Sequence, residues 1–186
     1  MKTVNVKITG ATPYSPSKYI DEPRKAKETP ADHEERVWRE RCHYEPKSKE
    51  CFIPAICFAK TVQGAASYLP IKIPGKQNAT YTKHFRAGLY VPEGLTLGVK
   101  IDDVEGEWLM VPSNGKPGGG SRVKKCFPIF RKWGGVVTFQ VLDDTVTEKI
   151  FEQTLQTAAA FIGLGRFRPE KGGWNGRFII DEIDWK

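Results

Sequence analysis

The sequence lacks any hydrophobic run near the roughly 20 residues that a helix needs to cross a bilayer. The first residues, MKTVNVKI, alternate polar and apolar side chains, which is typical of a strand and not of a signal peptide. We therefore expect no membrane partner and a location in the reducing cytoplasm. The length of 186 residues fits a single domain, residues 1–186, with a core of its own.

Metal-binding patterns are also lacking. The four cysteines, Cys42, Cys51, Cys57 and Cys126, form no CxxC pair, which argues against a zinc ribbon or a redox site. His43 could join the first three around a metal, but their spacing matches no common zinc module. We therefore expect free thiols, no metal site and no cofactor.

Catalytic patterns are equally scarce. Walker, Rossmann and HExxH motifs are absent, and there are only three histidines, His33, His43 and His84. His84 lies in the basic stretch KHFR, where a general acid or base for RNA cleavage is conceivable, although a binding role is the simpler interpretation. We therefore expect no catalysis, with a metal-independent endoribonuclease as the alternative.

Positive charge is in excess. Lys and Arg together number 29 against 22 Asp and Glu, which gives a formal net charge of +7 and a sequence pI near 9.2. This balance favours polyanionic partners, although an ordinary soluble basic protein would show it too.

Hydrophobic periodicity predicts the elements. Alternation predicts a strand over residues 3–9, and helical spacing predicts helices over 55–68 and 145–162, the second opening with a capping box at 145–148. Asp32 is expected to cap a short helix from His33 to Arg41, and residues 71–88 are expected to be irregular. Further strands are predicted over 88–91, 95–101, 107–111, 136–142 and 176–185, with a strand pair around 131–135.

This order predicts an α+β fold of the ferredoxin-like or RRM-like βαββαβ type. Two helices pack on one face of an antiparallel sheet, and the other face stays open for binding. Long insertions are expected at about residues 10–50 and 112–135. Residues 112–121 (PSNGKPGGGS) are expected to hold no regular structure.

The most informative segment is residues 163–178 (GLGRFRPEKGGWNGRF). It contains five glycines, three arginines and one lysine, with Phe167 and Trp174 as stacking platforms. Glycines let the backbone approach a phosphate, and arginines fork onto its oxygens. A plain turn with solvated arginines is the alternative.

A second basic cluster spans residues 118–125 and 131–133. It resembles a charged hairpin, with Trp133 at its tip, that could follow a nucleic-acid strand or clasp a neighbouring subunit, or simply be a solvated loop. A weaker basic patch comprises Lys18, Arg24, Lys25 and Lys27.

Three stretches resemble the RAMP superfamily, RRM-like proteins that include backbone subunits of CRISPR effector complexes. They are the opening strand with its PYSP loop, residues 52–66 (FIPAICFAKTVQGAA), and the glycine-rich residues 163–178. The family's Gly-Ser-Ser is Ala-Ile-Cys here at 55–57, whereas Lys60 stands where the family has lysine.

The resemblance implies that Lys60, Arg166, Arg168 and Arg177 face nucleic acid and that residues 112–135 form the protruding thumb. It also implies self-association or a ribonucleoprotein complex, with single-stranded RNA or DNA as partner. The short chain suggests a phage or mobile-element relative, and a subunit-mimicking CRISPR inhibitor is a further alternative. The full candidate set is Lys60, Lys83, His84, Arg86, Arg122, Lys124, Lys125, Arg131, Lys132, Trp133, Arg166, Phe167, Arg168, Lys171, Trp174 and Arg177.

Overall fold

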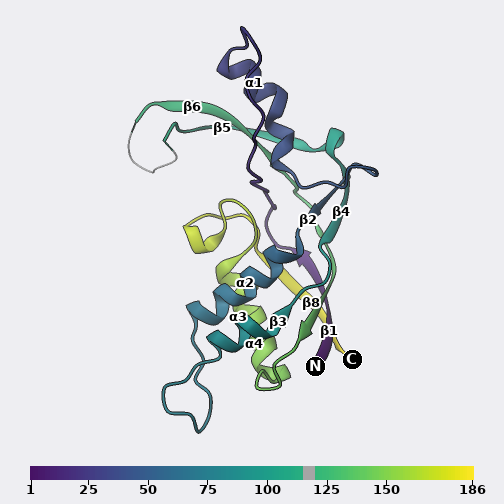
Figure 1. Ribbon diagram of the computed structural model, residues 1–186, viewed down its shortest axis with the longest axis vertical. Helices are drawn as coiled ribbons and strands as arrows, with labels where there is room; N and C mark the ends of the chain where they lie inside the picture. The colour runs from purple at the N-terminus through teal and green to yellow at the C-terminus, as the bar shows by residue number, and fades with distance from the viewer. Residues whose placement is uncertain (115–119) are drawn as a thin grey trace.

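The computed structural model describes residues 1–114 and 120–186, and it has the expected α+β fold (Figure 1). The core elements follow one another as strand, helix, strand, strand, helix, strand, which confirms the βαββαβ prediction. They are β1 (Lys2–Gly10), α2 (Ala55–Tyr68), β3 (Leu89–Tyr90), β7 (Gly134–Val141), α4 (Glu148–Thr157) and β8 (Phe178–Trp185). The strands form an antiparallel sheet in the order β3-β7-β1-β8.

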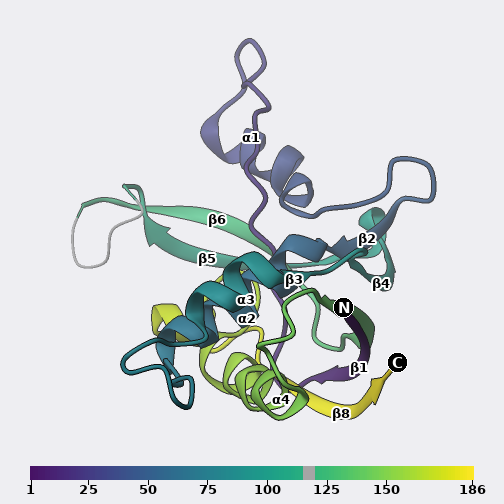
Figure 2. The ribbon, with the colours of Figure 1, turned by 60° about the horizontal axis from the view of Figure 1, so that its bottom comes forward.

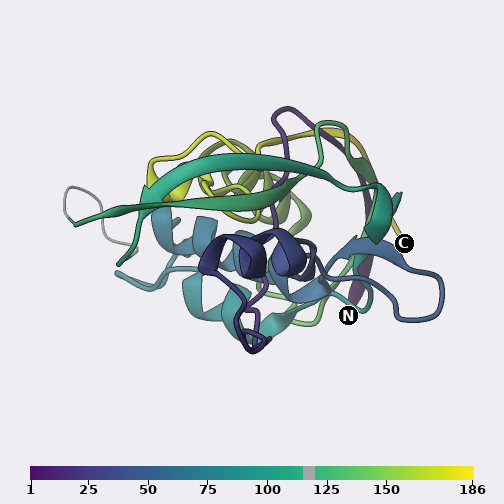
Figure 3. The same ribbon diagram turned by 90° about the horizontal axis from the view of Figure 1, so that it is seen from above.

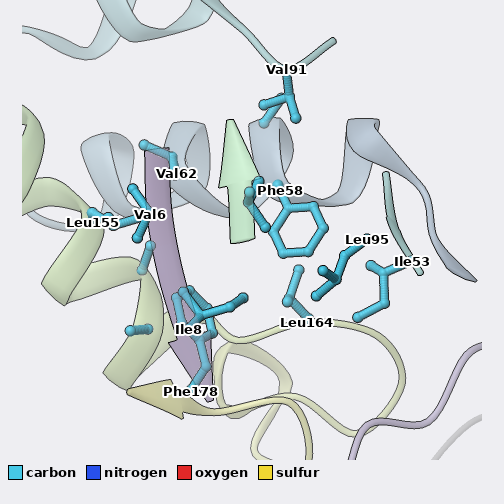
Figure 4. Close-up of a cluster of buried hydrophobic side chains, with 14 of the residues drawn as sticks. Val6, Ile8, Ile53, Phe58, Val62, Val91, Leu95, Leu155, Leu164 and Phe178 are labelled. Carbon is cyan, nitrogen blue, oxygen red and sulfur yellow. The ribbon is translucent and has the colours of Figure 1, made fainter. Parts of the chain in front are cut away.

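Strand β1 places the core on one face of this sheet. Val4, Val6 and Ile8 alternate along it and are buried. They pack with Phe58 and Val62 of α2 and with apolar residues of α4, and Figure 4 shows this cluster between strand and helices. The strict alternation of the first residues is therefore the pattern of a strand with one buried face.

The opposite face of the sheet is open and carries polar residues together with two exposed apolar ones, Val136 and Ile179. Thr9 donates to Asp181 at 2.7 Å, and Lys7 lies across from Glu182 in the β1–β8 register. Asp184 pairs in register with Asn5 on the same face. Strand β8 therefore lines the open face with carboxylates.

Further elements lie between the core strands. The first insertion holds α1 (Pro30–Val37), the 3₁₀ helix η1 (Trp38–Arg41) and β2 (Glu50–Ile53), which pairs with β4 (Leu95–Lys100). Helix α3 (Thr82–Gly88) follows α2, and the 3₁₀ turn η2 (Ile101–Asp103) follows β4. The π-helical segment η3 (Ala158–Ile162) continues α4, and the 3₁₀ turn η4 (Pro169–Lys171) lies in the glycine-rich loop.

A long hairpin projects from this body. Strand β5 (Glu105–Pro112) pairs with β6 (Arg122–Ile129) along its whole length, from Glu105 opposite Ile129 to Pro112 opposite Arg122. Figures 2 and 3 show the hairpin extending sideways, with α1 beside its base. None of the helices in the described residues has the length and hydrophobicity of a transmembrane span.

The second predicted insertion needs a correction. The sequence places it at 112–135, but the projecting hairpin runs from Glu105 to Ile129, and β6 and β7 pair with different strands. Residues 112–114 complete β5 and begin the turn, and residues 115–119 of the predicted irregular segment lie outside the described residues.

The prediction that Trp133 lies at the tip of a charged hairpin is also wrong. Its side chain is only 6% exposed, and its indole N–H donates to the carbonyl of Thr12 at 2.8 Å. Its ring would collide with a Cβ on Gly10, which would lie 2.2 Å from the indole nitrogen. Trp133 is a core residue and not the tip of an arm.

Three helix predictions differ in detail from the structure. Thr29, not Asp32, caps α1, because Asp32 occupies the third helical position of the capping box. Thr147, not Thr145, caps α4. Residues 82–88, predicted to be irregular, form α3, because burial of Phe85 stabilises a helix with little amphipathic pattern of its own.

Candidate nucleic-acid interface

The glycine-rich loop is clamped in place by backbone hydrogen bonds. The amide of Leu164 donates to the carbonyl of Gly176 at 3.0 Å, and the amide of Arg166 donates to the carbonyl of Ser15 at 2.7 Å. Gly176 has φ +78°, and a Cβ there would lie 1.9 Å from the Leu164 carbonyl oxygen. The loop therefore requires glycine at this position to hold its two ends together.

This loop borders a cleft of about 490 Å³. Its other walls are the first turns of α2, the loop after β1 and the ring of His43. Three cationic side chains line it from separate parts of the sequence, namely Lys18, Lys60 and Arg168. The cleft thus combines glycine backbone with a net positive charge, since these three cations outnumber the one carboxylate of the lining, Glu170, which pairs with Arg168. This combination suits a phosphate backbone.

Hydrogen bonds orient two of these cations. The ammonium of Lys60 donates to the Gln63 side chain at 3.2 Å. The Arg168 guanidinium donates to Glu170 at 2.8 Å and to the carbonyl of Gly165 at 3.2 Å. The helix α2 also begins here after Pro54, with no side chain capping its first turn. A helix N-terminus adds favourable partial charge for an anion.

Arg166 has a different position from the one expected. Its guanidinium carbon lies 3.4 Å from the ring centroid of Phe127 on β6 and 4.1 Å from that of Phe167. Its Nε and Nη2 atoms are buried and have no hydrogen-bond partner among the described residues. Burial lowers the pKa of Arg166 to about 10, a shift that Glu107 opposes, so the side chain stays charged at neutral pH. Arg166 thus joins the glycine-rich loop to the hairpin.

The hairpin carries aromatic and cationic side chains on one face. Trp108 and Met110 are exposed on β5, and the ammonium of Lys124 lies 4.8 Å from the Trp108 ring centroid. Arg122 donates to the Met110 carbonyl at 3.3 Å. Such a surface offers both stacking and phosphate contacts.

Glu34 of α1 fixes the base of the hairpin. Its side chain is 2% exposed, and it forms ion pairs with Arg41 at 2.9 Å and Lys125 at 2.7 Å. It also accepts the backbone N–H of Cys126 at 2.9 Å. Burial raises the pKa of Glu34, but the hydrogen bonds from Lys125, Cys126 and Arg41 outweigh it and hold the pKa below its usual value.

The structure brings part of the predicted set together. Lys60 and Arg168 line the cleft. The other predicted residues of the glycine-rich loop do not line the cleft but belong to the same loop as Arg168, and they are Arg166, Phe167, Lys171, Trp174 and Arg177. Arg122, Lys124 and Lys125 lie on β6, with Lys125 occupied by Glu34.

The other predicted residues lie elsewhere. Lys83, His84 and Arg86 are on α3 and do not line the cleft. Arg131 and Lys132 lie exposed in the turn between β6 and β7, where Arg131 pairs with Glu105 at 2.9 Å.

The histidines are positioned differently from one another. The Nδ1 of His84 lies 2.6 Å from a carboxylate oxygen of Asp143, a contact that ties α3 to the start of α4. His33 contacts the Glu22 carbonyl at 2.7 Å, in the first insertion. His43 alone of the three lines the cleft, where burial and the charge of Lys18 lower its pKa. The neutral imidazole is thereby favoured.

No group of three or more His, Cys, Asp or Glu side chains in residues 1–114 and 120–186 is placed to hold a metal. All four cysteines are free, and burial raises the pKa of each thiol. The thiols are therefore protonated and uncharged at neutral pH.

Sequence reasoning missed two components of the interface. It considers His43 only as a metal ligand, and it does not single out Trp108. It also places Lys18 in a separate weak patch, although Lys18 lines the cleft with Lys60. The sequence signal for Trp108 was its alternation with Met110 in a predicted strand. The structure leaves both side chains exposed, because that strand projects from the body of the protein.

Comparison with solved structures supports the fold assignment. The type III-B Cmr-beta assembly bound to cognate target RNA contains a chain that matches with a TM-score of 0.58 at 14% identity. The match covers 99% of this chain and 60% of the other, so this chain spans less than two thirds of its neighbour. A Cas6 product complex matches with a TM-score of 0.34 at 14% identity, covering 94% and 50%, which is too distant to support an argument. No family model matches the sequence, and no curated protein matches it.

These findings define an RRM-like α+β fold with a basic cleft and a projecting hairpin. The particular resemblance is between this fold and that of the chain in the type III-B Cmr-beta assembly.

Proposed function

We propose that this protein binds single-stranded nucleic acid, with RNA as the first candidate, and acts as a non-catalytic part of a ribonucleoprotein complex. The observation that carries the proposal is the convergence of Lys18, Lys60 and Arg168 on one cleft beside the glycine-rich loop. The RNA-bound state of the Cmr-beta assembly supports RNA over DNA.

The binding path runs from the hairpin to the cleft. Trp108 and Lys124 supply stacking and charge on the hairpin, and Arg166 connects β6 to the loop that borders the cleft. The open face of the sheet is a poor alternative, because Asp181, Glu182 and Asp184 would repel phosphates.

A fluorescence-anisotropy titration with labelled single-stranded RNA and DNA at several salt concentrations tests the proposal. Lys60→Ala and Arg168→Ala should each weaken binding and reduce the salt slope by about 0.7 for every phosphate that the variant no longer neutralises. Lys7→Ala on the open face is the matched control and should bind like the wild type. Absence of binding to both nucleic acids at low salt would refute the proposal.

Assembly with further copies of the chain belongs to the same proposal. Sedimentation velocity with and without RNA measures it directly, and RNA-dependent growth of the sedimenting species is the expected result. A strictly monomeric one-to-one complex with RNA long enough for several copies would refute self-association and leave RNA binding intact.

RNA cleavage is the second candidate function, and the position of His43 favours it. A neutral imidazole beside Lys18 in the cleft could accept a proton from a ribose hydroxyl. Incubation of end-labelled RNA with the protein in EDTA tests this candidate. Cleavage by the wild type that is lost in His43→Ala would support it, and intact RNA after prolonged incubation would refute it.

A further inference from the structure

Two exposed aromatic rings lie on the molecule outside the cleft. Tyr68, the last residue of α2, is 61% exposed, and Phe161 of the π-helical segment is 55% exposed. Their ring centroids are 5.8 Å apart and their planes differ by 19°, so the rings stack. Neither side chain belongs to the hydrophobic core, because both remain largely exposed to solvent.

The pair continues toward the glycine-rich loop. The Nε of Arg177 donates to the carbonyl of Ala160, next to Phe161, at 3.1 Å. Its Nη1 donates to the carbonyl of Trp174 at 3.4 Å, and the Trp174 side chain is exposed. One guanidinium therefore links the backbone beside Phe161 to the backbone of Trp174. We call Tyr68, Phe161 and Trp174 the aromatic row.

The sequence segments around Tyr68 and Phe161 are free of carboxylates. Between Glu50 and Glu93 there is no Asp or Glu, while Lys60, Lys72, Lys76, Lys83 and Arg86 fall within that stretch. The stretch between Glu152 and Glu170, which contains Phe161, also has none. The segments that carry Tyr68 and Phe161 therefore lack the negative charge that would repel a polyanion, and the segment around Tyr68 adds cations.

We propose that the aromatic row is a second stacking platform, which binds unpaired bases of a single strand after it leaves the cleft. This inference rests on the proposed function and adds a site to it. Successive bases of single strands stack on exposed aromatic rings whatever their identity, because every base has a π-face. The charge of the neighbouring segments favours nucleic acid over a protein partner, whose own surface would need to be acidic.

Oligonucleotide length separates the row from the cleft. A strand of about 5 nucleotides is short enough to occupy the cleft region alone, whereas one of about 16 nucleotides can also reach the row. The double variant Tyr68→Ala with Phe161→Ala should weaken binding of the long strand by about tenfold or more. It should leave the affinity for the short strand unchanged.

Two controls isolate the role of the rings. Tyr90→Ala removes a tyrosine of similar exposure, 52%, from the open sheet side and should bind both strands normally. The exchange Tyr68→Phe with Phe161→Tyr keeps both rings and should retain the long-strand affinity. Circular dichroism and thermal unfolding verify that each variant folds before it is titrated.

A long strand with abasic sites in the part beyond the first 5 or so nucleotides completes the test. Wild type and double variant should bind this strand equally, because the stacking groups are gone. The inference is overturned if the double variant binds the intact long strand as the wild type does, or if it weakens the abasic strand to the same degree. It is also overturned if only self-association weakens, which would make the row a contact between copies. Failure of the wild type to bind either strand would instead refute the proposed function.

Discussion

The guanidinium of Arg166 stacks against the ring of Phe127, with 3.4 Å between the guanidinium carbon and the ring centroid. Phe127 lies on β6 and Arg166 in the glycine-rich loop, 39 positions later in the chain. Arg41 approaches the same ring at 5.2 Å and pairs with Glu34. The orientation of the hairpin relative to the loop therefore depends on stacked planar groups.

Replacement of Arg166 should distinguish stacking from simple charge. Arg166→Lys keeps a partly buried charge but loses the plane that stacks on Phe127, and we expect it to lower the free energy of unfolding by about 1–2 kcal/mol. Arg166→Met keeps apolar contact without a charge to desolvate and should cost about 1 kcal/mol or less. Chemical denaturation measures both, and a lysine variant as stable as the wild type would contradict the stacking role.

Removal of Glu34 should loosen the hairpin base. Glu34→Gln leaves Arg41 and Lys125 without their shared carboxylate, and we expect a loss of about 3 kcal/mol in the free energy of unfolding. Hydrogen exchange should show faster exchange at the Cys126 amide, which donates to Glu34. Exposed Glu35→Gln on the same helix is the control and should change neither quantity.

The same carboxylate gives stability a pH dependence. The pKa of Glu34 is lower in the folded protein than its usual value of about 4.3, so its contribution is fully present above pH 4.3. The contribution is lost as the pH falls through the lower folded-state pKa. The stability difference between wild type and Glu34→Gln should therefore shrink as the solution is acidified, and a difference that does not change with pH below about pH 4.3 would contradict this assignment.

Protonation of Asp143 should also lower the stability of the fold in acid. Its hydrogen bond with His84 lowers the pKa of Asp143 to about 2, so the contact stabilises the fold above about pH 4 and is lost between about pH 4 and 2. Because the pair is partly solvated, we expect only about 1 kcal/mol from it. Asp143→Asn should remove that part of the pH profile, whereas Asp144→Asn should not.

Gly10 and Trp133 should behave as a packing pair. Gly10→Ala forces a methyl group against the indole ring and should destabilise the protein by about 1–3 kcal/mol. Trp133→Ala should cost about 3–5 kcal/mol by leaving a cavity. Trp133→Phe should bind nucleic acid with wild-type affinity if it folds, and a selective loss of affinity would show that the buried ring has a direct binding role.

The sequence predicted the strands and helices of the core well and the insertions poorly. Strict alternation over Val4, Val6 and Ile8 and the helical spacing of 55–68 reflect burial on one face, which any single element reveals. Strand β6 pairs with the strand before it, β5, and not with the strand after it, β7, and alternation within a strand does not reveal which neighbour it pairs with. Helix α3 was missed for a related reason, since Phe85 gains its stability from packing that no local pattern records.

The sequence singled out the part of the candidate interface that is continuous in the chain. The glycine-rich loop was recognised from composition, but its cleft also contains Lys18 and His43, which come from two segments of the first insertion, one before α1 and one after η1. Trp133 illustrates the opposite error, because an aromatic residue between cations looks the same in sequence whether it stacks on a base or fills the core.

The carboxylates of β8 on the open sheet face have a consequence for the rate of association. With Asp181, Glu182 and Asp184 on that face and the cationic cleft formed by α2 and the glycine-rich loop, the molecule has an electrostatic dipole. A polyanion approaching in solution would turn the protein so that the cleft arrives first, which raises the fraction of productive collisions. This orientation acts over about a Debye length and fades as salt is added.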